Sequence, residues 1–347
     1  MACDEISKGG AREDILATVS ESPTALTFPA VSIKALRGLF CYDGSVSQPR
    51  KHHYIPAFYL KQWATKGVLC EMRKTNGRII RKHKHPDGTG YKRDLYRIEG
   101  VSDEIAQHFE RKFMQMVDTD ASDALKTIQR VGEWSIRERD GWIRFLLSLL
   151  FRNPEAVETV KAQIREIWRV SIAAFEENYE AKRGPDDPPT FEEFKALTSP
   201  DAPEIAASNF LQTIMNGPNT GPAIAKMQWG KIYLKNSKFT LLTSDRPLDM
   251  PKALSNPEAY IALPIGPRLI FVATNNLKLI ETLRRTDHTK MARSLNLKVV
   301  AQAREYVWGL DDSQAGFVER HIGKMPDRQL ISDRGRTSTL LAATGQS

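Results

Sequence analysis

The sequence contains few cysteines and no long apolar stretch. Only three of its 347 residues are cysteine, and no two of them form a C-x-x-C pair. This argues against both a disulfide framework and a zinc knuckle, so we expect reduced thiols. The longest apolar run, residues 145–151, is far shorter than the roughly 20 residues of a membrane span. The first residues also lack the pattern of a secretory signal, so we expect a cytoplasmic protein without a membrane partner.

Several signatures of common enzyme classes are absent as well. The chain contains no GxGxxG or Walker loop, so a classical nucleotide-binding fold is not supported. It also lacks the G-x-S-x-G elbow of many serine hydrolases. No internal repeat is present, which argues against a solenoid or propeller.

Positive charge, by contrast, is in excess. Lysine and arginine number 50 and aspartate and glutamate 42, which gives a net charge of +8 and a sequence pI near 9.3. This balance is compatible with binding to nucleic acid or another polyanion, although many ordinary proteins are equally basic.

The N-terminal part combines irregular sequence with one strong turn signal. Residues 1–48 show no sustained period and are expected to form a loosely attached extension. Asn76-Gly77 separates two strand-like runs, residues 68–72 and 78–81, and therefore predicts a β-hairpin. Residues 82–88, which include His83 and His85, should then form an exposed basic loop.

The middle of the chain has a helical period. Ser135 and Glu138 fit a capping box at the start of an almost wholly apolar helix, and Pro154 marks the first turn of the next one. Helices are predicted over residues 102–116, 121–130, 135–151, 154–179, 191–197 and 202–215.

The C-terminal part is predicted to contain an antiparallel sheet. Two hairpins are expected, one from residues 227–234 and 239–243 and one from residues 259–264 and 268–274 around Gly266-Pro267. Two helices, 277–285 and 289–304, and a last strand, 306–310, follow. We therefore predict an α+β fold with an N-terminal β-hairpin element, a helical middle section and a C-terminal antiparallel sheet. Residues 49–312 should form one integrated domain, and residues 313–347 a tail.

Four motifs in this order resemble a known bacterial family. They are His52-His53-Tyr54-Ile55-Pro56-Ala57-Phe58-Tyr59-Leu60, the apolar helix ending in Arg152-Asn153-Pro154, Leu242-Thr243-Ser244-Asp245-Arg246-Pro247-Leu248, and Ser294-Leu295-Asn296 leading to Ala303-Arg304-Glu305-Tyr306-Val307. Together they resemble Domain of Unknown Function 4238 over roughly residues 50–312. The chain departs from the family pattern at Asn153 and Arg246, where threonine and asparagine are usual. The resemblance implies no activity, but it indicates which residues could meet in space.

The adjacent histidines are the first candidates for chemistry. On an extended segment His52 and His53 point to opposite faces, so they cannot easily share one ion. One of them could act as a general base or a metal ligand, as in small ββα nucleases with a similar opening. The asparagine and later helical histidine of such nucleases are missing here. The alternative is that both imidazoles are held by hydrogen bonds within a structural strand. His83 and His85 have a spacing suited to a metal pair, but the lysine between them favours a solvated loop.

Three further candidates lie in the other motifs. Asp245 follows an apolar strand, where rigid scaffolds often place catalytic carboxylates, and Ser244 precedes it. The alternative is a turn in which both side chains accept hydrogen bonds from backbone N–H groups. Arg152 ends the apolar helix, and a charge beside a buried surface needs a partner. We expect Arg152 to pair with Asp245 or with an anionic ligand.

Two functions remain open from the sequence. The leading hypothesis is a hydrolase of phosphodiester or nucleic-acid substrates, with His52 or His53 as general base or metal ligand, Asp245 as partner carboxylate and Arg152 as phosphate contact. A divalent metal ion is the cofactor considered, and its ligands are unknown. The alternative is a non-catalytic nucleic-acid- or protein-binding protein, in which the same motifs are structural and basic segments such as residues 73–84 contact phosphates.

Overall fold

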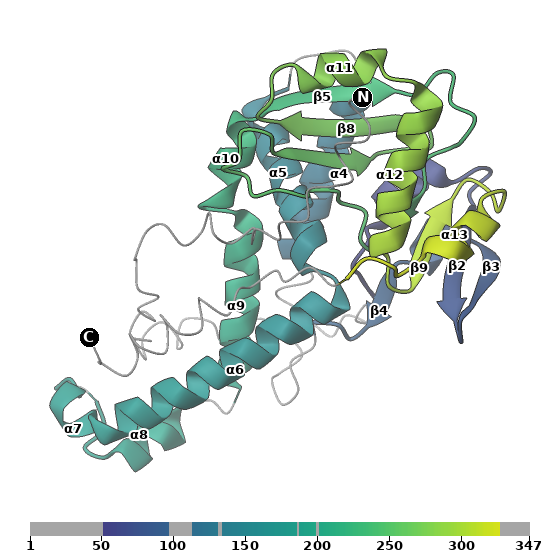
Figure 1. Cartoon of the computed structure of the whole chain (residues 1–347). Helices are drawn as coiled ribbons and strands as arrows, with labels where there is room; N and C mark the ends of the chain where they lie inside the picture. Colours follow the sequence, from purple (N-terminus) through teal and green to yellow (C-terminus); the bar gives the residue numbers. More distant parts are fainter. Residues whose placement is uncertain (1–50, 97–112, 131–133, 186, 199–200, 327–347) are drawn as a thin grey trace.

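A computed structural model describes residues 51–96, 113–130, 134–185, 187–198 and 201–326 (Figure 1). The N-terminal extension expected over residues 1–48 lies outside this part of the chain. So do most of the helix expected from residue 102 and the end of the expected tail. The described fold is α+β, as predicted, with a small N-terminal β element, a helical middle and a C-terminal antiparallel sheet.

The N-terminal β element is built from two strand pairs. β1 (Lys51–His53) pairs antiparallel with β4 (Tyr91–Arg93), and β2 (Leu69–Thr75) pairs with β3 (Arg78–Lys84). The predicted hairpin is confirmed, and Asn76 and Gly77 adopt positive φ values of 50° and 78°, as the turn requires. Two short helices, α2 (Ala57–Leu60) and η3 (Lys61–Trp63), connect β1 to β2. The basic loop expected from residue 82 is wrong in part, because β3 continues to residue 84 before η4 (Pro86–Gly88) begins.

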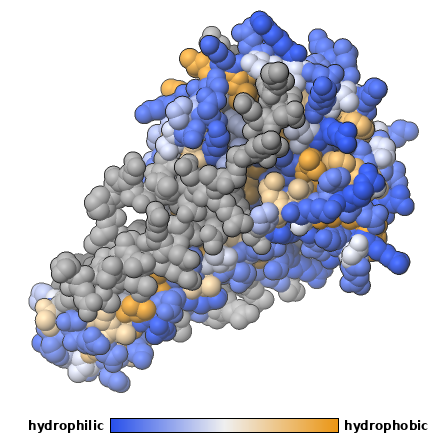
Figure 2. Space-filling view, viewed as in Figure 1, coloured by the Kyte–Doolittle hydropathy of each residue, from blue (hydrophilic) through white to orange (hydrophobic). Residues whose placement is uncertain are grey.

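The helical middle follows the predicted periods closely. The capping box of Ser135 and Glu138 is confirmed at the start of α5 (Ile136–Phe151), and Asn153 caps α6 (Pro154–Glu177) through the Ala156 N–H. Residues 121–130 are not a separate helix but the second half of α4. The other helices are α4 (Gln115–Gln129), α7 (Tyr179–Lys182), α8 (Phe191–Leu197), α9 (Ala202–Asn216) and α10 (Thr220–Lys226). The far end of α6 projects with α7 and α8 as an arm (Figure 1), where apolar side chains reach the surface (Figure 2).

A three-stranded sheet carries helices on both faces. Its order is β5 (Gln228–Tyr233), β8 (Leu269–Thr274), β7 (Tyr260–Pro264), and the predicted pairing of residues 259–264 with 268–274 is confirmed. Successive β8 side chains face opposite ways: Phe271 packs on Trp142 of α5, whereas Ile270 and Val272 pack with the helices on the other face. Those helices are α11 (Leu279–Arg285) and α12 (His288–Gln302).

The hairpin expected from residues 227–234 and 239–243 is wrong. Residues 239–242 form no strand, and the two-residue strand β6 (Thr243–Ser244) pairs with β9 (Tyr306–Gly309) in a second sheet of order β3-β2-β9-β6. The backbone N–H groups that would have paired in a hairpin instead donate to acceptors far away in the sequence. Leu241 N–H donates to the Pro267 carbonyl (2.8 Å), and Leu242 N–H donates to Asn296 Oδ1 (2.9 Å).

The expected boundary at residue 312 is also misplaced. A further helix, α13 (Ala315–His321), follows β9, and its Val318 is buried with Met72 of β2 and Val307 of β9. The packed structure therefore continues beyond residue 312. No helix among the described residues is both long and apolar enough to cross a membrane.

Candidate functional site

His52 has a structural environment. Its side chain is 5% exposed and stacks on the Tyr96 ring, with centroids 5.5 Å apart. Its Nδ1 accepts a hydrogen bond from the Tyr96 N–H (3.2 Å). The imidazole thus fixes the segment after β4 to β1, which corresponds to the structural alternative considered for this residue.

His53 lies on the opposite face of β1, as the strand alternation predicts, and its environment differs. Its ring meets the edge of Tyr91, and its Nε2 is buried without a hydrogen-bond partner in the described structure. Burial lowers the pKa of His53, and the Arg152 guanidinium lowers it further, while Asp118 and Asp87 oppose the shift. The imidazole is therefore neutral near pH 7 and retains a nitrogen that could accept a proton.

Arg152 is almost completely buried at the C-terminal end of α5, and its carboxylate partner is not the expected one. Nη1 donates to Oδ1 of Asp118 (2.8 Å), and Nη2 donates to Oδ2 of Asp118 (3.3 Å) and to the His53 carbonyl (2.7 Å). The requirement for a partner was predicted correctly, but the pairing with Asp245 was wrong. Arg152 joins α4, α5 and β1 at one point.

Asp245 is buried and holds a turn. Its Oδ1 accepts from the Arg304 N–H (2.9 Å), and its Oδ2 accepts from the N–H groups of Glu305 (2.7 Å) and Tyr306 (2.9 Å). Burial raises the pKa of Asp245 to about 6, because desolvation outweighs these hydrogen bonds and the nearby Arg246. Ser244 Oγ accepts from the Arg246 N–H (3.1 Å). Both side chains bind backbone N–H groups, as the turn alternative proposed, although Asp245 reaches the start of β9 rather than its own turn.

The five candidates therefore do not meet at one place. His53 meets Arg152, and Asp118 completes that group. Asp245 instead joins the end of β6 to the start of β9, and the Ser244 hydroxyl binds within the adjoining turn, while His52 contacts Tyr96 apart from both groups. Where the chain is described, no group of three His, Cys, Asp or Glu side chains could hold a metal ion. His85 is exposed and contacts Asp87 (3.1 Å), and Cys70 is a buried free thiol whose pKa is raised by burial to about 11.

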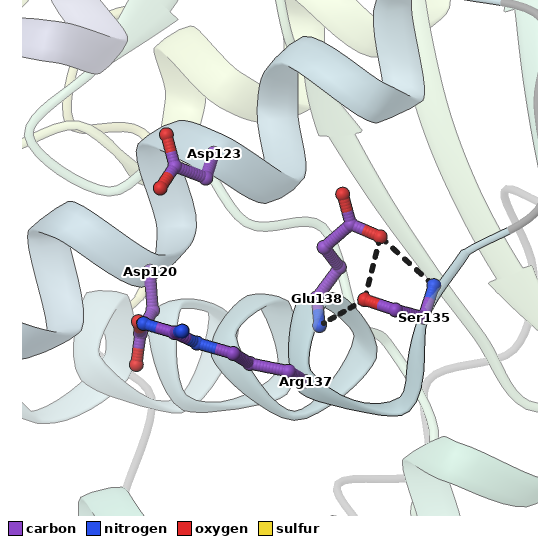
Figure 3. A pocket seen from close by; sticks show the side chains of 5 residues that line it. All are labelled: Asp120, Asp123, Ser135, Arg137 and Glu138. Carbon is purple, nitrogen blue, oxygen red and sulfur yellow. Dashed lines mark hydrogen bonds and ion pairs between the residues drawn. The ribbon is translucent and has the colours of Figure 1, made fainter.

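A surface hollow lies between α4 and α5 (Figure 3). Its lining is polar, but its side chains already bind one another. Asp120 pairs with Arg137 (3.1 Å), and Glu138 is engaged in the capping box with Ser135. The side chains that line the hollow therefore cap a helix and form an ion pair, and this arrangement does not indicate a ligand-binding site.

Positive charge is distributed unevenly along the chain, which the composition of the whole chain does not reveal. Residues 51–96 contain 11 lysines and arginines but only three carboxylates, which gives a net charge of 11 − 3 = +8. This equals the net charge of the whole chain, so the remaining residues carry 39 charges of each sign. A count by segment rather than over the whole chain would have found this.

Comparison with known families agrees with the motifs. Residues 51–313 match the family described as "Protein of unknown function (DUF4238)". The chain belongs to this family. The resemblance seen in the four motifs is thereby confirmed, and the match runs from β1 to just beyond β9. No curated protein and no solved structure matches the chain.

Proposed function

We propose that the protein binds nucleic acid through its N-terminal β element, residues 51–96. The observation that carries this proposal is that the net positive charge of the chain is concentrated in this element. Lysine and arginine side chains neutralise phosphates and release counterions, which supplies most of the sequence-independent affinity for nucleic acid.

The positions of these charges support the proposal. Ten of the 11 basic residues are exposed. Those on or beside the strands are Lys51, Arg73, Lys74, Arg78, Arg81, Lys82, Lys92 and Arg93. Two of them are neutralised from outside the element, Arg73 by Glu305 and Arg81 by Asp312. Of the element's own carboxylates, Glu71 is buried and accepts a hydrogen bond from Thr89.

Charge reversal on β3 tests this function. Arg78→Glu combined with Lys82→Glu should weaken binding of a labelled oligonucleotide by at least about tenfold, and should reduce the salt slope of log K by about 2, because two phosphate contacts are lost. Fluorescence anisotropy from about 50 to 200 mM salt, with single-stranded and duplex probes, measures both quantities.

The matched control is Lys235→Glu combined with Lys238→Glu. These lysines are also exposed, and the change in net charge is the same. If the control weakened binding as much as the β3 variant did, long-range charge rather than the β element would account for binding. No binding by the unmodified protein at the lowest salt would contradict the function itself.

A hydrolase acting on phosphodiesters is the second candidate, and the environment of His53 is the observation that favours it. A neutral imidazole with a buried, unbonded Nε2 beside a guanidinium combines a proton acceptor with a cation suited to phosphate. Asp245 and Ser244 contribute less support, since their oxygens already serve backbone N–H groups.

The hydrolase candidate predicts a loss of activity on His53→Ala. Phosphodiesterase and nuclease rates of the purified protein, with and without Mg²⁺, Mn²⁺ or Zn²⁺, should fall at least about a hundredfold if His53 is the general base. His85→Ala, which changes an exposed histidine of the same element, is the control. Equal background rates for all three proteins would reject the hydrolase.

A further inference from the structure

The arm carries an aromatic cluster that is separate from the main hydrophobic core. On α6 the buried members of that core end at Ile164. Further along, rings from α6, α7 and α8 pack together with neighbouring centroids 5.3–6.3 Å apart: Phe175, Tyr179, Phe191 and Phe194. Tyr179 is buried, but the three phenylalanines are only half-buried, and Leu197 of α8 is 66% exposed. The arm therefore presents apolar surface to solvent (Figure 2).

The same arm is acidic. Residues 170–198, which make up the arm, contain three basic residues and seven carboxylates, which gives a net charge of 3 − 7 = −4. Five of the carboxylates are exposed glutamates, namely Glu176, Glu177, Glu180, Glu192 and Glu193. An apolar centre rich in aromatic rings with a charged rim is the usual composition of a protein–protein interface.

The charges indicate which surface covers the arm. The N-terminal β element has a net charge of +8, so its sign is opposite to that of the arm. Pairing of two arms, or of two β elements, would bring like charges together, whereas pairing of an arm with a β element is attractive. The arm projects away from β2 and β3 of its own chain (Figure 1), but every other copy of the chain offers the same basic element.

We propose that the arm of one copy docks on the N-terminal β element of a second copy. The aromatic cluster supplies the apolar contact, and the surrounding glutamates face exposed basic side chains such as Arg78 and Lys82 of β3. Because each copy has one arm and one β element, a two-fold axis allows both contacts to form at once and closes the assembly as a dimer. The dimer uses charges of the proposed nucleic-acid surface, but it does not require nucleic acid to bind there.

Sedimentation velocity of the protein without nucleic acid tests the dimer. Over about 1 to 100 µM protein we expect a dimer at about 50 mM salt and dissociation towards monomer at about 500 mM, because salt screens the attraction between opposite charges. Glu176→Lys combined with Glu177→Lys should weaken the dimer at least about tenfold, and so should Arg78→Glu combined with Lys82→Glu. The two lysines lie in the last turn of α6, where positive charge is compatible with the helix end.

Matched variants elsewhere on the surface control for net charge alone. Glu258→Lys combined with Glu281→Lys, and Lys235→Glu combined with Lys238→Glu, change the same charges at exposed positions outside both surfaces. These variants should dimerise like the unmodified protein. Thermal unfolding verifies that each variant folds.

Three results would overturn the proposal. The first is a protein that stays monomeric at every concentration at low salt, and the second is a control variant that dissociates as much as the variants of the two surfaces. The third is a dimer that tightens with salt or with the two lysines on α6, since that is the behaviour of two acidic arms in contact. Oligonucleotide binding is measured separately, so a monomer that still binds nucleic acid rejects the dimer and not the proposed function.

Discussion

Aspartate is a common catalytic residue, but the carboxylate of Asp245 instead accepts hydrogen bonds from the backbone. Its two oxygens accept hydrogen bonds from three N–H groups just before and at the start of β9. Tyr59 of the first family motif and Trp63, just after that motif, behave similarly. The Tyr59 hydroxyl donates to the Pro264 carbonyl (2.6 Å), and Trp63 Nε1 donates to the Leu241 carbonyl (2.7 Å). These polar atoms join segments that lie about 180 to 200 positions apart in the chain.

Asp245→Asn should therefore destabilise the protein. The amide keeps one acceptor oxygen but places an NH₂ group against backbone N–H donors, so we expect a loss of about 2 kcal/mol or more in the free energy of unfolding at pH 7. Urea denaturation measures it. Asp287→Asn is the control, because Asp287 caps α12 by accepting one N–H and asparagine caps helices equally well.

The pH dependence adds a second readout to this comparison. The pKa of Asp245 is about 6 in the folded protein, above the ordinary 3.8, so the folded state binds the proton more tightly than the unfolded state does. Wild-type stability should rise relative to Asp245→Asn as the pH falls from 7 to 5, by about 1 kcal/mol. A gap that narrows over this range would contradict the burial of an ionisable Asp245.

At the scale of helices and strands, local sequence signals were sufficient to predict the elements whose turn or first residues are set by neighbours in the chain. The Asn76-Gly77 turn, the Ser135 capping box and the proline at the start of α6 each act through atoms within a few residues, so the sequence predicted those elements. The hairpin expected at residues 227–243 failed because a tertiary acceptor, Asn296 Oδ1, replaced the strand partner. β1 and β4 have three residues each, too few to show an alternation.

The candidate site was harder to predict for a related reason. The sequence indicated that Arg152 needs a partner, but α4 offers three aspartates, Asp118, Asp120 and Asp123. The packing of α4 on α5 determines that Asp118 faces Arg152 and that Asp120 pairs with Arg137, whereas Asp123 pairs with Lys126 of its own helix. Similarly, nothing local brings Asp245 to the N–H groups of Glu305 and Tyr306. Contacts between distant segments decide which side chains form a site, and a single sequence does not reveal them.

At the scale of the whole molecule, one hydrophobic core connects all three parts of the chain. It contains Trp63 from the N-terminal element, Trp142 and Leu146 from α5, Phe271 from β8 and Trp308 from β9. The N-terminal β element thus exposes its basic side chains to solvent. Its aromatic side chains are buried in the core that it shares with the rest of the chain. This arrangement favours the single integrated domain that we predicted, and it predicts that the β element does not unfold separately.

Leu146→Ala tests this integration. Leu146 is 1% exposed, so its truncation should lower the free energy of unfolding by about 2–5 kcal/mol. If the domain unfolds as one unit, native-state hydrogen exchange should show the same loss at the most protected amides of β2 and β9 as at those of α5, because all of them exchange through the same global opening. Leu197→Ala, at a position that is 66% exposed on the arm, should change these amides by less than about 0.5 kcal/mol. Unchanged protection in β2 and β9 beside a destabilised α5 would instead divide the chain into two units, with the charged β element able to fold, and bind, independently of the helices.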